Sequence, residues 1–78
     1  MVGTVSKYDR TRSYGFILSD NPDDPDYFVC APFILDKGRY LMPNWRVEFT
    51  PVEGPRGFEA RDVRVIAKTI ARQTNGAV

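Results

Sequence analysis

Apolar and polar residues alternate with a period of two along most of this chain, which is typical of strands that bury one face. The alternation is clearest over residues 2–8, 14–18, 27–30, 46–50 and 58–66. Turn-forming residues separate these stretches, because residues 20–25 and 54–57 are rich in Asp, Pro and Gly, and Pro32 ends the third stretch. The pattern predicts five short strands and no strong helix.

Five short strands in a chain of 78 residues predict one all-β domain. We expect a small five-stranded antiparallel barrel over residues 1–66, because closing the sheet removes its exposed edges. Residues 33–45 have no regular pattern, and residues 67–78 are expected to form a short C-terminal tail. Residues 66, 67, 70 and 71 of this region are apolar and predict one amphipathic helical turn.

The charges are distributed unevenly, although the net charge is only +1. Residues 13–36 hold five acidic side chains and no basic one, whereas residues 37–78 hold eight basic side chains against four acidic ones. A basic patch is expected if the first and last segments meet in space. Aromatic residues make up 13% of the chain, and so small a core cannot bury all of them, so some rings are expected to be exposed.

The sequence argues against several classes of protein. There is no apolar run long enough to span a membrane and no basic-then-apolar start, so we expect neither a membrane protein nor a secretory leader. A single cysteine, Cys30, cannot form an internal disulfide, which favours a cytoplasmic protein. The absence of histidine removes the commonest general base and metal ligand. We therefore expect no enzymatic activity, no cofactor and no metal, and we interpret acidic residues 20–26 as a solvated loop.

Several short motifs, taken in order, resemble those of the cold-shock domain. They are Gly-Thr-Val at residues 3–5, Tyr-Gly-Phe-Ile at 14–17, Asp-Tyr-Phe-Val at 26–29, Val-Glu-Phe at 47–49 and Glu-Gly-Pro-Arg-Gly at 53–57. The resemblance covers residues 2–66. It implies a five-stranded OB-fold whose second and third strands carry two RNP-like motifs and bind single-stranded RNA or DNA.

The chain also departs from the pattern of that family. Typical members close the first strand with Lys-Trp-Phe-Asn, where this chain has Ser-Lys-Tyr-Asp at residues 6–9. The second RNP motif usually ends in His-Phe, and Cys30 and Ala31 stand there instead. Two stacking positions are lost, so the resemblance implies a reduced binding surface.

Strand alternation places Tyr14 and Phe16 on one face of the sheet, and Phe28 shares its face with Cys30. If the second and third strands pair, Tyr14, Phe16 and Phe28 form one aromatic surface. Single strands need rings for their bases and cations for their phosphates. The residues expected beside the rings are Lys7, Tyr8 and Arg12. Ordinary packing of the rings is the alternative.

The remaining candidates each have two interpretations. Arg56 is in a predicted turn rich in glycine, where it either contacts a phosphate or is simply solvated. Phe58 either extends the stacking surface or caps the barrel. Tyr40 lies near the position of a loop aromatic in the family. We expect Trp45 to pack at the barrel end rather than on a base, and Cys30 to be an inert small residue, with redox sensitivity as the alternative.

These observations predict a monomer that binds single-stranded RNA or DNA with low sequence specificity. The resemblance implies a use as an RNA chaperone or regulator. The predicted binding residues are Lys7, Tyr8, Arg12, Tyr14, Phe16, Phe28, Tyr40, Arg56 and Phe58. The alternative is a protein-interaction module on a cold-shock-like barrel that has lost most nucleic-acid binding.

Overall fold

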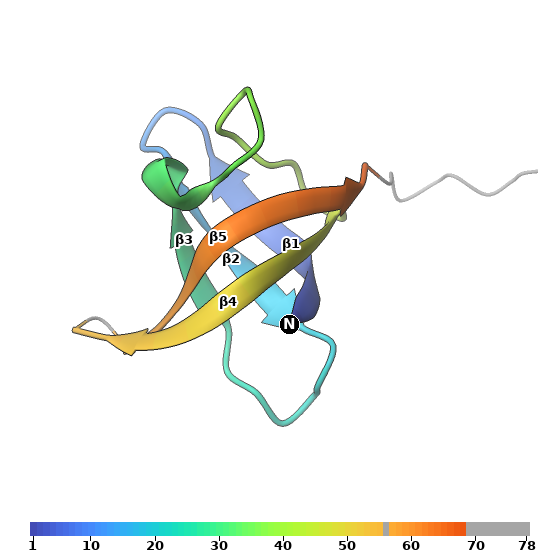
Figure 1. Cartoon of the computed structure of the whole chain (residues 1–78), viewed down its shortest axis with the longest axis vertical. Helices are drawn as coiled ribbons and strands as arrows, with labels where there is room; N and C mark the ends of the chain where they lie inside the picture. Colours follow the sequence, from blue (N-terminus) through green and yellow to red (C-terminus); the bar gives the residue numbers. More distant parts are fainter. Residues whose placement is uncertain (56, 69–78) are drawn as a thin grey trace, which may run out of the picture.

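The computed structural model describes residues 1–55 and 57–68, which form five strands and one short 3₁₀ helix (Figure 1). The elements are β1 (Val2–Asp9), β2 (Tyr14–Ser19), β3 (Tyr27–Cys30), η1 (Ala31–Phe33), β4 (Arg46–Gly54) and β5 (Gly57–Ala67). The all-β prediction is confirmed, and each predicted strand overlaps one of these. Residues 66 and 67 belong to β5, and the remainder of the predicted helical turn, at residues 70 and 71, lies outside the described residues.

The strands close into a barrel in the order β1-β2-β3-β5-β4. The pairs β1–β2, β2–β3, β1–β4 and β4–β5 are antiparallel, as expected. The barrel closes through a short parallel contact between β3 and β5, where Phe28 is the register partner of Glu59. A ring of five strands cannot alternate in direction throughout, so one parallel junction is required. The far end of the β4–β5 hairpin projects beyond the barrel (Figure 1).

The core fills the inside of the barrel with apolar side chains from alternate strand positions. Its buried residues are Val5, Ile17, Tyr27, Val29, Ile34, Leu41, Trp45, Val47, Phe49, Ala60 and Val63. The strand members of this set confirm the predicted alternation. Ile34, Leu41 and Trp45 come from the connection between β3 and β4. This segment therefore closes one end of the barrel, and the expectation that Trp45 packs there is confirmed by its exposed fraction of 8%.

β4 is longer than predicted, because it continues through Pro51 to Gly54. Proline lacks an N–H and is tolerated in a strand where no ladder bond is lost. The register of β1 covers only Arg46, Val47 and Glu48 of β4, so the residues after Thr50 have β5 alone as a partner. Pro51 therefore extends an edge of the sheet rather than ending the strand.

β5 contains an irregularity that keeps its apolar residues inside the barrel. Ala60 and Val63 are both buried, although an odd spacing would put them on opposite faces of a regular strand. The register between β4 and β5 shifts at this point, and Asp62 has a φ of +50°. The extra residue of this β-bulge rotates Val63 back toward the core.

Candidate functional site

Three aromatic rings lie together on the outer face of β2 and β3. Tyr14, Phe16 and Phe28, which we call the aromatic triad, are all half-buried. Their ring centroids are 6.2 Å apart for Tyr14–Phe16, 5.5 Å for Tyr14–Phe28 and 5.7 Å for Phe16–Phe28. Phe16 and Phe28 are direct register partners across the two strands. The predicted contiguous aromatic surface is therefore confirmed as a geometric feature.

A β-bulge brings Lys7 onto this face. Val5 pairs with Ile17 in the core, and the next register pair is Lys7 with Phe16, so Ser6 is an extra residue in β1. In a regular strand Lys7 would point to the same side as Val5 and enter the core. The bulge turns it outward, and its Nζ lies 5.8 Å from the centroid of the Phe16 ring.

Tyr8 follows the bulge and lies beside the triad rather than within it. Its register partner is Gly15, and a Cβ on that glycine would come within 2.7 Å of the Tyr8 Cα. Glycine is therefore needed for the ring to lie over β2, where it packs against the core. The Tyr8 hydroxyl donates to the Arg39 carbonyl at 3.4 Å. Burial raises the pKa of Tyr8, the electrostatic effect of the neighbouring Cys30 adds to the rise, and Arg10 opposes it. Tyr8 still borders the triad, because a hollow of about 150 Å³ is lined by Lys7, Tyr8, Asp9, Tyr14 and Gly15.

Arg12 lies in the β1–β2 turn, on the far side of a hollow from two rings of the triad. The Asp9 carboxylate oxygen Oδ1 accepts hydrogen bonds from the backbone N–H groups of Thr11 at 3.0 Å and Arg12 at 3.1 Å, which orders the turn. The Arg12 side chain is 73% exposed, with its Nε 3.9 Å from the other Asp9 oxygen. An open hollow of about 470 Å³ separates it from the rings; it is lined by Arg12, Ser13, Tyr14, Phe28, Cys30 and Pro32.

Cys30 is half-buried and lines that hollow. It is the register partner of Tyr14 and shares the outer face with Phe28, as predicted. Ala31 begins η1, and its N–H donates to the Ser13 carbonyl at 3.0 Å, which ties the β1–β2 turn to the end of β3. The hollow therefore lies where the sequence has small side chains instead of the rings expected from the family.

Tyr40 belongs to a different cluster. The centroid of the Tyr40 ring is 5.7 Å from that of Trp45. The guanidinium carbon of Arg10 lies over the Tyr40 ring, 4.0 Å from its centroid. The Lys68 ammonium lies 4.9 Å from the Trp45 centroid. These contacts pack the β3–β4 connection against the barrel end. The structure therefore does not bring Tyr40 into ring contact with the triad.

Phe58 lies near the start of β5 and is 42% exposed. Its ring meets the edge of Tyr27 at a centroid distance of 5.9 Å, and Tyr27 in turn packs on Phe49 in the core. Tyr27 and Phe28 are consecutive in β3 and point to opposite faces. Phe58 is thus on the inner side of the sheet, away from the triad, which favours the capping interpretation. Arg56, the remaining predicted contact, lies outside the described residues.

Sequence reasoning missed a polar cluster on β5. Arg61 forms an ion pair with the buried Glu59, with 3.0 Å between Nη2 and Oε1, and its guanidinium lies over the Phe33 ring. The signal was a Glu-x-Arg spacing, which places both side chains on one face of the predicted fifth strand. The contribution of Phe33 had no such signal, because it comes from η1.

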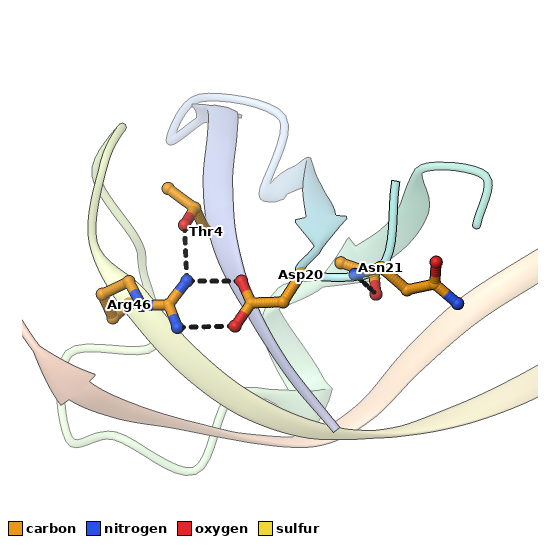
Figure 2. A network of polar contacts seen from close by, with 5 residues as sticks. Thr4, Asp20, Asn21 and Arg46 are labelled. Atoms are coloured by element: carbon orange, nitrogen blue, oxygen red, sulfur yellow. Dashed lines mark hydrogen bonds and ion pairs between the residues drawn. The ribbon is translucent and has the colours of Figure 1, made fainter. Parts of the chain in front are cut away.

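The acidic loop is anchored by an ion pair that the sequence did not indicate (Figure 2). Asp20 binds Arg46 in a bidentate manner, with distances of 2.6 and 2.8 Å, and Arg46 also donates to the Thr4 hydroxyl at 2.9 Å. Hydrogen bonding to Arg46 is the main cause that lowers the pKa of Asp20, and it raises the pKa of Arg46. This network joins β1, β4 and the end of β2, so it fixes one side of the barrel.

Two classes of feature are not found in residues 1–55 and 57–68. No group of His, Cys, Asp or Glu side chains there has the arrangement of a metal site. No helix in the same part of the chain has the length and apolar character needed to cross a membrane.

Comparisons with known proteins identify related sequences. Residues 1–66 match the family model of the 'Cold-shock' DNA-binding domain. The chain is 38% identical to the major cold shock protein of Micrococcus luteus over 63 residues, which cover 80% of this chain and 92% of that protein. It is 31% identical to a cold shock-like protein of Stigmatella aurantiaca over 64 residues, with coverages of 82% and 94%.

The fold also matches a solved structure. The Drosophila Unr CSD456 structure superposes with a TM-score of 0.69 at 20% identity, covering 91% of this chain and 28% of that one. The closed five-stranded barrel and the family match over residues 1–66 lead to one conclusion: this chain belongs to the cold-shock domain family.

Proposed function

We propose that this protein binds single-stranded nucleic acid by stacking bases on the aromatic triad and by neutralising phosphates with flanking cations. The single observation that supports this most is the packing of three rings on one outer face, with centroids 5.5–6.2 Å apart. Three adjacent rings form an apolar patch, and its contact with water costs free energy unless a ligand covers it. Base–aromatic stacking supplies that cover.

The charges near the triad suit a phosphate chain. Lys7 lies beside Phe16, and the exposed Arg12 flanks the hollow next to Phe28. Arg56, which lies outside the described residues, is a further proposed phosphate contact. Cations in these positions attract the backbone without reading the bases, which leads to strong salt dependence and low sequence specificity.

Single strands are the expected ligand because a base must be unpaired to lie flat on a ring. Binding therefore competes with base pairing. An RNA chaperone acts in this way, because it holds bases in the unpaired state. We expect moderate affinity, since Cys30 and Ala31 provide no ring where the family usually has two. We propose that the protein acts as a cytoplasmic monomer that binds its ligand and catalyses no reaction.

The direct test is a titration of fluorescently labelled oligo-dT and oligo-U, followed by anisotropy, beside a duplex of matched length. The proposal expects saturable binding of both single strands and much weaker binding of the duplex. If neither single strand binds, or if the duplex binds as tightly, the proposal is wrong. The first of these results would favour a protein-interaction module.

A further inference from the structure

A second group of side chains lies on the outer face, directly beside the aromatic triad. The parallel register between β3 and β5 pairs Phe28 with Glu59. Arg61 follows Glu59 by two residues, so both side chains leave β5 on the same face. The outer face therefore continues from the triad across β3 onto β5.

The segment after η1 is held against the same strand. Ile34 forms a parallel bridge with Val63, and the N–H of Leu35 donates to the Val63 carbonyl at 2.8 Å. These contacts place Phe33 next to Arg61. The guanidinium carbon of Arg61 lies 4.4 Å from the centroid of the Phe33 ring. The two residues come from separate elements that backbone hydrogen bonds keep together.

Arg61 is restrained at two points. Its Nη2 donates to Oε1 of Glu59 at 3.0 Å, and its guanidinium rests over Phe33. Glu59 is only 9% exposed, so its carboxylate depends on this cation for charge compensation. The Arg61 side chain nevertheless remains 36% exposed. The guanidinium is thus restrained at two points, on a side chain that is partly exposed to solvent.

We propose that Arg61, supported by Phe33, is an additional stacking site for one nucleobase next to the bases on the triad; this inference rests on the proposed function. Bases stack on arginine guanidinium planes as well as on aromatic rings. Because Arg61 is already ordered by Glu59 and Phe33, a base that stacks on it causes little further loss of side-chain freedom. Arg61 also neutralises Glu59, which would otherwise repel phosphates beside Phe28.

The test separates stacking from charge. Arg61→Lys keeps the positive charge and removes the planar group, and the protein is titrated with oligo-dT of about four and about eight nucleotides, near the lower end of OB-fold site sizes. We expect binding of the longer strand to weaken about fivefold or more, the effect of losing one stacked base, while the shorter strand binds almost as before. The salt dependence should be unchanged. Phe33→Leu should act in the same direction, because the guanidinium loses its support.

Arg64→Lys is the matched control, since Arg64 is an exposed arginine of the same strand that lines a hollow with Met1 and Glu48. It should bind both strands like the unchanged protein. Thermal melting verifies that each variant is folded. NMR of the Arg61 Nε–H group in the unchanged protein provides a test without mutation, because a stacked base must shift this signal when the longer strand is added.

An unshifted Arg61 signal, or a folded Arg61→Lys protein that binds the longer strand normally, overturns the inference while leaving the proposed function intact. An equal loss in Arg64→Lys also overturns it, because the effect would then be general. If the unchanged protein binds neither strand, the proposed function itself fails.

Discussion

Lys7 of β1 lies directly opposite Phe16 of β2, and its ammonium nitrogen is 5.8 Å from the centre of the ring. This pairing exists because β1 accommodates an extra residue at Ser6. A cation at the edge of a stacking surface is in position to contact the phosphate of a nucleotide whose base lies on the ring. The bulge therefore joins the two chemical properties that the proposed binding requires.

Removal of a triad ring should weaken binding and leave the fold intact. Phe16 and Phe28 are half-buried on the outer face, so their truncation opens no core cavity. At about 1–3 kcal/mol per stacked base, Phe16→Ala or Phe28→Ala should weaken oligo-dT binding by about 5- to 150-fold. Anisotropy titration measures the change. Leu35→Ala, at an exposed apolar position outside the triad, is the control, and normal affinity in a folded Phe16→Ala protein would contradict the platform.

The salt dependence of binding should reflect a small number of phosphate contacts. If Lys7, Arg12 and Arg56 each neutralise one phosphate, the slope of log K against log salt should be about −2, from about −0.7 per contact on single strands. Lys7→Gln and Arg12→Gln should each reduce its magnitude by about 0.7 without changing base preference. Titrations at several salt concentrations measure the slope. A slope near zero would show that phosphates are not bound.

The fluorescence of Trp45 should change little when an oligonucleotide binds. The indole is 8% exposed and contacts Tyr40 and Lys68 at the barrel end, in a cluster separate from the triad. A base stacked on the triad therefore does not reach it. Emission spectra recorded during a titration that anisotropy shows to be saturated provide the measurement. Strong quenching would place the binding surface around Trp45 instead.

A ring at position 30 should strengthen binding. Cys30 lines the hollow of about 470 Å³ beside Phe28 and faces outward, so Cys30→Phe adds a stacking surface without entering the core. A stacked base contributes about 1–3 kcal/mol, reduced by the entropy of ordering the ring, so we expect at least severalfold tighter binding of oligo-dT. Cys30→Ser is the matched control and should bind like the unchanged protein. A folded Cys30→Phe protein with unchanged affinity would mean that bases do not approach this hollow.

The ion pair between Asp20 and Arg46 should make stability depend on pH. Its hydrogen bonds lower the pKa of Asp20 in the folded state, so the carboxylate stabilises the fold above its ordinary pKa. That stabilisation disappears as the pH falls through the lowered value. Asp20→Asn should therefore reduce the melting temperature at neutral pH, and the difference from the unchanged protein should shrink in acid.

Asp23→Asn is the control for this prediction. Asp23 is an exposed residue of the same loop, and it forms no ion pair with the described residues. Circular dichroism melts at several pH values measure both variants. Identical melting of Asp20→Asn and the unchanged protein at neutral pH would show that the pair contributes nothing to stability.

Local patterns were sufficient to predict the strands and the aromatic triad. Alternation with period two assigns Tyr14, Phe16 and Phe28 to one face and Ile17 to the other, and this holds because β2 and β3 are regular strands. The burial of Trp45 at the barrel end was also predictable. Alternation is a property of the backbone itself, so it can be read wherever no residue is inserted.

Other features could not be predicted without the strand pairing of the closed barrel. They are the two bulges, the Arg61 cluster and the positions of Tyr40 and Phe58. Whether Ser6 is an extra residue is decided by the strand that pairs with it, and no local pattern records that pairing. Phe33 meets Arg61 only because β3 and β5 adjoin through the parallel junction that closes the ring. The sequence alone determined which residues alternate within each strand, whereas the tertiary structure decided which strands adjoin, because closure of the barrel brings together residues far apart in the chain.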